Sequence, residues 1–183
     1  MNDSTGPLLP DWQVSQWFNV RAAPQLADLR GRVVLIHAFQ MLCPGCVAHG
    51  LPLAAKVHET FAPQDVAVVG LHCVFEHHDA MPPHALAAFI HEYRLRFAIG
   101  VDRPSADGPI PHTMARWELQ GTPSTLVLDR SGHVRLHHFG ALDELRLGAL
   151  IGQLLAQAPG VQATAGDAAG SAGCADGACE ATG

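Results

Sequence analysis

Hydrophobic residues along the chain fall into short continuous runs separated by amphipathic stretches. Residues 33–39 and 66–73 are almost uninterruptedly apolar and β-branched, which is typical of central strands buried on both faces. Shorter runs predict strands at 97–101, 124–129 and 133–139. The last two flank Arg130-Ser131-Gly132, a hairpin signal. Residues 12–19 mix aromatic and polar side chains, and predict a short first strand or turn.

Amphipathic stretches between these runs predict helices. After Cys43, apolar residues recur at helical spacing as far as Phe61, and Pro52 within this stretch is expected to bend the helix. The residues at 26–32 predict a turn closed by Gly31. Further helices are predicted at 83–93, 110–119 and 142–156, with Pro83 suited to a first helical turn.

The order of these elements predicts an α/β domain. Helices between successive strands require crossovers and therefore a parallel core, to which the hairpin adds an antiparallel edge. We expect an N-terminal extension at 1–11, a domain at 12–157, and a flexible tail at 158–183. The tail is rich in Gly and Ala and has too few large apolar residues to offset its ordering entropy.

Composition and charge narrow the classes of function. The chain has 183 residues, of which 48% are hydrophobic, and a formal charge of −6 without a basic stripe, so a nucleic-acid partner is not expected. No apolar run is long enough to span a membrane. The first residues show no secretory signal, which predicts a cytoplasmic location. Cysteines there are more often catalytic, metal-binding or free than structural disulfides.

A pair of cysteines carries the candidate chemistry. The sequence Cys43-Pro44-Gly45-Cys46 lies where an apolar strand ends and a helix begins. A helix N-terminus presents unpaired N–H groups, which favour thiolate over thiol. Two sulfurs so spaced can close and reopen a disulfide. We therefore expect thiol–disulfide exchange, with Cys43 as the nucleophile and Cys46 as the resolving thiol.

Metal binding is the alternative interpretation of these cysteines. A structural zinc site needs four ligands, usually from a second close pair, and the only other close pair is Cys174 and Cys179 in the tail. That tail pair could shuttle electrons to Cys43, capture a soft metal, or be passive. A region after the second strand is also rich in possible ligands, although a solvated loop is the simpler interpretation: His72, Cys73, His77, His78 and His84. Cys73 on a buried strand is most often inert.

Together these motifs resemble the thioredoxin superfamily, and within it the TlpA/ResA-like redoxins related to the AhpC/TSA grouping. The resemblance covers roughly residues 12–157. Besides the C-x-x-C, it rests on Gly31-Arg32-Val33-Val34-Leu35-Ile36, on Gly121-Thr122-Pro123-Ser124-Thr125-Leu126-Val127-Leu128-Asp129, and on Gly132. It implies a thioredoxin-like fold, in which a central mixed sheet is flanked by helices.

The resemblance also implies roles for residues outside the C-x-x-C. The Thr122-Pro123 bond is expected to be cis and to face the disulfide, with the Thr122 backbone turned toward a substrate chain. His37 stands where thioredoxins carry a buried Asp, and could take the proton of the resolving cysteine or be an ordinary core histidine. Glu76, after the second strand, is a candidate carboxylate near the active site, or a solvated loop residue. Leu42 replaces the tryptophan usual before the first cysteine.

The expected reaction is exchange of electrons with a disulfide-containing protein or a small thiol substrate, reset by a thiol reductant system. We expect no bound cofactor and no metal. One rival is a peroxiredoxin-like antioxidant peroxidase, but Gln40 occupies the position where such enzymes carry Thr or Ser. The other rival is a non-enzymatic metal-binding or redox-sensing module that uses the tail cysteines and loop histidines.

Overall fold

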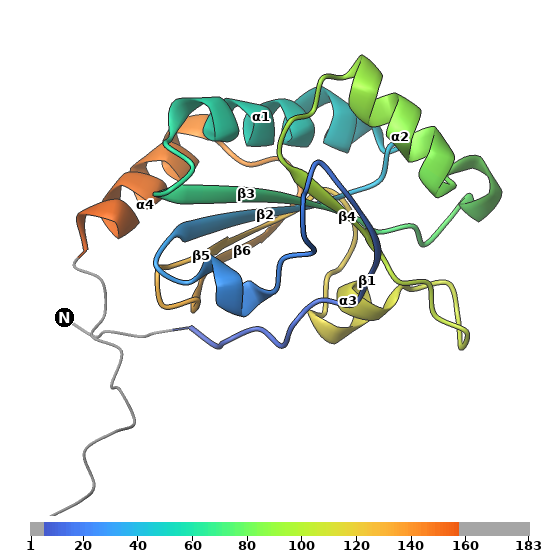
Figure 1. Cartoon of the computed structure of the whole chain (residues 1–183), viewed down its shortest axis with the longest axis horizontal. Coiled ribbons are helices and arrows are strands. Elements are labelled where there is room, and N and C mark those ends of the chain that lie inside the picture. The colour runs from blue at the N-terminus through green and yellow to red at the C-terminus, as the bar shows by residue number, and fades with distance from the viewer. Residues whose placement is uncertain (1–5, 158–183) are drawn as a thin grey trace, which may run out of the picture.

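A six-stranded mixed sheet forms the centre of the computed structural model, which describes residues 6–157 (Figure 1). The strand order is β1-β4-β3-β2-β5-β6. β2, β3 and β4 are parallel, whereas β1 pairs antiparallel with β4, and β5 pairs antiparallel with both β2 and β6. The strands are β1 Val14–Phe18, β2 Val33–Phe39, β3 Val66–His72, β4 Ala98–Asp102, β5 Ser124–Leu128 and β6 Val134–Phe139.

Helices cover both faces of the sheet. In Figure 1, α1, α2 and α4 lie on one face and α3 lies on the other. The long helices are α1 Leu51–Thr60, α2 Pro83–Glu92 and α4 Glu144–Ala156, and α3 is the short helix His112–Arg116. Short helical turns complete the described chain: η1 Leu26–Leu29, the π-turn η2 Cys46–Gly50 and η3 His78–Ala80.

The hydrophobic core has two layers, one on each side of the sheet. Along β2 the side chains alternate between them, because successive residues of a strand point to opposite faces. Leu35 and Phe39 join the layer under α1, α2 and α4, whereas Val34, Ile36 and Ala38 join the layer that holds α3. His37 lies between Leu35 and Phe39 in this alternation and points to the same face as they do, so its side chain faces the helix that follows the cysteines.

The thioredoxin-like α/β fold expected from the sequence is confirmed, with differences in detail. The predicted helix at 110–119 is much shorter, because Pro111 is its N-cap and Glu118 adopts a positive φ of 54° that ends the helical turn. Pro52, predicted to bend a helix from within, instead lies in the first turn of α1, where it interrupts no α-helical hydrogen bond, and the π-turn η2 immediately precedes that helix. The 12–19 stretch forms strand β1 at an antiparallel edge.

Residues ahead of β1 pack against the domain. The Val134 N–H donates to the Pro7 carbonyl at 3.0 Å, and the Trp117 indole N–H donates to the Pro10 carbonyl at 2.9 Å. Part of the predicted 1–11 extension therefore belongs to the folded unit. The predicted flexible tail, with Cys174 and Cys179, lies outside the described residues. Within 6–157, none of the helices combines the length and apolar character that crossing a bilayer requires.

Candidate active site

The paired cysteines lie at the carboxyl end of the parallel core. β2 ends at Phe39, and the chain is helical again from Pro44, so Cys43 immediately precedes the first helical residue. Proline suits that first position because it has no N–H to leave unpaired. This strand-to-helix junction is the one that the sequence predicted. It holds Cys43 where helical N–H groups lack carbonyl partners.

The two thiols differ in their access to solvent. Cys43 is partly exposed and Cys46 is completely buried, and both are unbridged. Their Sγ atoms lie 2.7 Å apart, and the Cys46 backbone N–H points at the Cys43 Sγ at 3.3 Å. An N–H directed at sulfur stabilises a thiolate there. The arrangement therefore offers one accessible nucleophile with a second sulfur behind it, within reach of bond formation.

Burial holds Cys46 in its thiol form. Desolvation, followed by the hydrogen bond to Cys43 and the charge of Cys43, raises the pKa of Cys46 to about 12. The Gln40 backbone and the Thr122 side chain, which lie near the sulfur, act in the opposite direction and lower this pKa. Cys46 must therefore lose its proton during the reaction, and the site supplies groups that ease this loss.

A cis-proline lies against the cysteine turn. The Thr122–Pro123 peptide bond is cis, as expected. The Cys43 thiol donates to the Thr122 carbonyl at 3.5 Å. A Cβ on Gly45 would lie 3.3 Å from Cδ of Pro123, so the glycine of the C-x-x-C allows this close approach. The Gly140 N–H donates to the Pro123 carbonyl at 2.8 Å, which ties the turn to the end of β6.

His37 lies buried beneath the same helix. Its Nδ1 lies 3.3 Å from Oγ1 of Thr125, the residue paired with it across the β2–β5 ladder, and its ring stacks on Phe39. Its Nε2 is buried and has no hydrogen-bond partner among the described residues. Burial lowers the pKa of His37 to about 4, so the imidazole is neutral near pH 7 and its Nε2 keeps a free lone pair or N–H facing the helix.

Glu76 lies at the rim of the site. It is exposed, and its Oε1 accepts a 3.4 Å hydrogen bond from Nε2 of buried Gln40. The Gln40 carbonyl in turn accepts from the Cys43 N–H at 3.2 Å. Glu76 thus contacts the turn before Cys43 through Gln40. His72, at the end of β3, supports the same turn by accepting the Met41 N–H on Nε2 at 3.4 Å.

Cys73 belongs to a different network. Its thiol is buried and donates to Oδ2 of Asp102 at 3.6 Å. Burial, followed by the charge of Asp102, raises the pKa of Cys73 well above its ordinary value. Asp102 also accepts the Thr113 and Met114 N–H groups at the start of α3, both at 2.8 Å. Cys73 is therefore a structural thiol beside the site.

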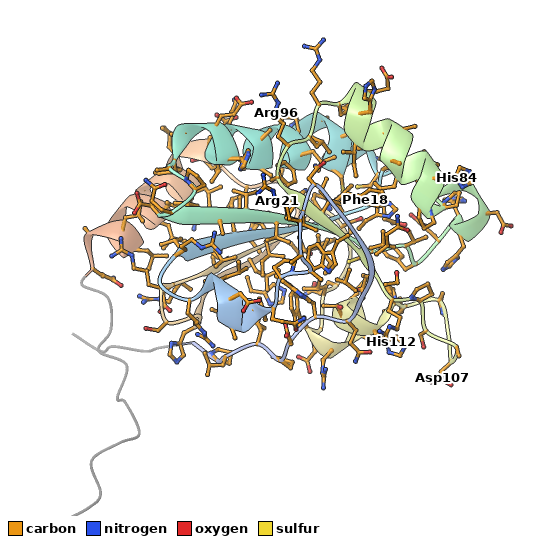
Figure 2. The ribbon with its side chains drawn as sticks, viewed as in Figure 1. Phe18, Arg21, His84, Arg96, Asp107 and His112 are labelled. Atoms are coloured by element: carbon orange, nitrogen blue, oxygen red, sulfur yellow. The ribbon has the colours of Figure 1, made fainter. Side chains whose placement is uncertain are left out.

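The histidines after β3 do not assemble into a metal site. Across residues 6–157, no three His, Cys, Asp or Glu side chains converge closely enough to hold an ion. Figure 2 shows His84 on α2 and His112 at the start of α3, well apart. His77 and His78 lie exposed in and beside η3.

The sequence did not predict several of the contacts around the cysteines. Thr125 and Gly50 both contact His37, and His72 and Gln40 support the turn. Thr125 could have been found from the pairing of β2 with β5, once that register was known. Gly50 stands two residues before Pro52, and that proline was a signal of an irregular helix. The side chain that fills the space above Gly50 is known only from the tertiary structure.

Comparisons with known proteins place the chain in a family. The model of the AhpC/TSA family matches residues 7–137. The thioredoxin-like superfamily protein SPOA0173 is 56% identical, with 83% of this chain and 98% of that chain covered and a TM-score of 0.81. A thiol-disulfide isomerase from Corynebacterium glutamicum is 46% identical, with 84% and 98% covered and a TM-score of 0.80. The comparison with curated proteins found no match.

A more distant structure shares the fold. It is a thiol:disulfide interchange protein DsbE, described as putative, from Chlorobium tepidum, 20% identical with a TM-score of 0.67 over 82% of this chain and 97% of that one. Fold, site and comparisons together define a thioredoxin-superfamily redoxin, an oxidoreductase of the thiol–disulfide class. The chain belongs to the AhpC/TSA family.

Proposed function

We propose that the protein exchanges electrons with disulfides through the Cys43–Cys46 pair, and that its substrates are protein disulfides or small disulfides. One observation carries this proposal: the Sγ atoms lie 2.7 Å apart, with Cys43 accessible and Cys46 buried. In such a dithiol the accessible sulfur can attack a substrate disulfide, and the buried sulfur can then form an intramolecular disulfide with it. A thiol reductant then reduces the Cys43–Cys46 disulfide again. The cytoplasmic location expected from the sequence stays a prediction.

The cycle consumes one substrate disulfide. The Cys43 thiolate attacks a substrate sulfur, the substrate S–S bond breaks, and the first substrate thiolate leaves and takes a proton. Cys46 then loses its proton and attacks the Cys43 Sγ. The Cys43–Cys46 bond forms, the mixed disulfide breaks, and the second substrate thiolate leaves. Two electrons have passed from the dithiol to the substrate, and an external thiol returns them.

The second step requires that Cys46 become a thiolate. In the mixed disulfide the Cys43 sulfur carries no charge, so the Cys43 charge that raises the Cys46 pKa disappears. The Gln40 backbone and the Thr122 side chain still favour the anion. We assign His37 as the group through which the proton leaves, because it lies on the same side of the sheet and has an unused Nε2; its lowered pKa makes it a weak base, so it passes the proton on and does not keep it.

Two exposed apolar side chains near the site favour a polypeptide substrate. Leu42, next to Cys43, is 56% exposed, and Phe139, which lies over Gly121, is 50% exposed. A substrate chain bound at Cys43 would cover these side chains, and removing their apolar surface from water is favourable. The 46% identical neighbour named as a thiol-disulfide isomerase supports the same substrate class.

The test is reduction of a protein disulfide such as that of insulin by the reduced protein. We expect turnover that Cys43→Ser abolishes, whereas Cys46→Ser accumulates a mixed disulfide visible by mass spectrometry. Oxidised wild type should lose two daltons within the peptide that spans both cysteines. Faster consumption of hydrogen peroxide than of insulin disulfide, with a sulfenic acid on Cys43, would instead favour the peroxidase.

A further inference from the structure

The first turn of the redox helix contains a space for the His37 ring. η2 is a π-turn, closed by the Leu51 N–H donating to the Cys46 carbonyl. Gly50 is its last residue and Cys46 its first. Residues four apart project from nearly the same side of a helical turn. Cys46 and the bare Cα of Gly50 therefore face the sheet together.

The His37 ring fills the space over Gly50. A Cβ on residue 50 would overlap Cε1 and Nε2 of His37. The opposite edge of the ring is held, because Nδ1 lies 3.3 Å from Thr125 Oγ1, and the parallel Phe39 ring lies beside it with centroids 6.3 Å apart. The ring edge that touches Gly50 is thus the edge bearing the unpartnered Nε2.

We infer that Gly50 is a positioning residue for disulfide exchange, which holds Nε2 of His37 against the turn that carries Cys46. The inference rests on the proposed function and extends it by a residue that never touches the substrate. A side chain at residue 50 would push Nε2 away from this turn or break the contact with Thr125. The π-turn and the glycine together then serve the second step of the cycle, in which Cys46 gives up its proton.

Other titratable groups near the ring are few among the described residues. Cys46 lies in the core layer on the same side of the sheet, at the start of η2, and His72 lies beyond Phe39 on β3, with ring centroids of Phe39 and His72 5.2 Å apart. β5 contributes the uncharged Thr125. Cys73 packs in the opposite core layer, where the charge of Cys46 contributes to its raised pKa, and it contacts Asp102 rather than the ring. A pH effect that depends on residue 50 is therefore assigned to His37 and Cys46.

The experiment is a double-mutant cycle of Gly50→Ala and His37→Ala, read as the rate at which the mixed disulfide resolves across pH. Gly50→Ala alone should slow resolution by roughly tenfold or more and change the pH profile. In the His37→Ala background, where the ring is gone and the space is free, the same change should have almost no further effect. Gly148→Ala is the matched control, because a Cβ added to that helical glycine would meet no atom within 4 Å.

Each outcome decides the inference. Equal effects of Gly50→Ala with and without His37, or an unchanged pH profile in Gly50→Ala, overturn it. If Gly50→Ala fails to fold, rescue of folding and of pH-independent resolution in the double variant supports it, and continued misfolding overturns it. The proposed function is tested separately: it fails if the wild type does not reduce protein disulfides, if Cys43→Ser retains that reduction, or if peroxide is consumed faster than insulin disulfide, whatever residue 50 does.

Discussion

At the scale of single residues, environment separates three cysteines of identical chemistry. Cys43 is partly exposed and receives an N–H from the helix start. Cys46 is buried with a pKa raised to about 12, and reacts only toward its neighbour. Cys73 is buried and bonded to Asp102. Burial and hydrogen bonding, rather than residue type, decide which thiol reacts.

We expect iodoacetamide to modify Cys43 of the reduced, folded protein and to leave Cys73 unmodified. The reason is that Cys73 is inaccessible and its raised pKa keeps it protonated. Peptide mass spectrometry after brief alkylation gives the answer, with a sample unfolded in guanidinium as the control in which Cys73 should react. Modification of Cys73 at the rate of Cys43 would contradict the assignment.

At the scale of elements, the short helix α3 depends on a strand residue. Its five residues are too few to be stable from propensity alone. Asp102, at the end of β4, accepts two of its N-terminal N–H groups, and Trp117 after the helix packs into the core. The sequence predicted a helix here, but not its length, because the tertiary cap and the positive φ of Glu118 set its ends.

Replacing Asp102 by Ala should lower the free energy of unfolding by about 2–4 kcal/mol, since it leaves two buried N–H groups without acceptors. Urea unfolding followed by far-UV circular dichroism measures the change. Asp107→Ala is the control: that residue is exposed in the loop before α3, where Figure 2 shows it well away from the sheet, and should change stability by less than about 0.5 kcal/mol. Equal effects of both variants would refute the capping role.

At the scale of the whole molecule, two buried histidines link folding to pH. Burial lowers the pKa of both His37 and His72 to about 4, from 6.5 in the unfolded chain. Between pH 6.5 and 4 both histidines bind protons in the unfolded chain but stay neutral in the folded chain. Stability is therefore complete above about pH 6.5 and is lost as pH falls toward 4. Asp102 acts in the opposite direction, because burial raises its pKa.

We expect the free energy of unfolding to fall between pH 6.5 and 4, with about 3 kcal/mol of that fall from each histidine. His37→Gln and His72→Gln should each reduce the slope, because glutamine does not titrate. The measurement is urea unfolding at a series of pH values, with His84→Gln, an exposed residue of α2, as the control. A slope unchanged in both buried-site variants would contradict this account.

Local patterns in the sequence were sufficient for the order of elements, the parallel core and the position of Cys43-Pro44-Gly45-Cys46 before a helix. These features depend on apolar periodicity and on residues adjacent in the chain, which a sequence displays directly. The cis Thr122–Pro123 bond was anticipated only by resemblance to a family.

Tertiary structure alone decided which side chains surround the sulfurs. Thr125 meets His37 across two strands, Gly50 makes room for its ring, and Gln40 connects Glu76 to the turn. Such contacts join residues far apart in the chain, and they follow from strand register and close packing rather than from local pattern. Burial likewise exists only in the folded protein. The sequence therefore revealed which atoms can react, whereas packing determined the pKa and the accessibility of each of them.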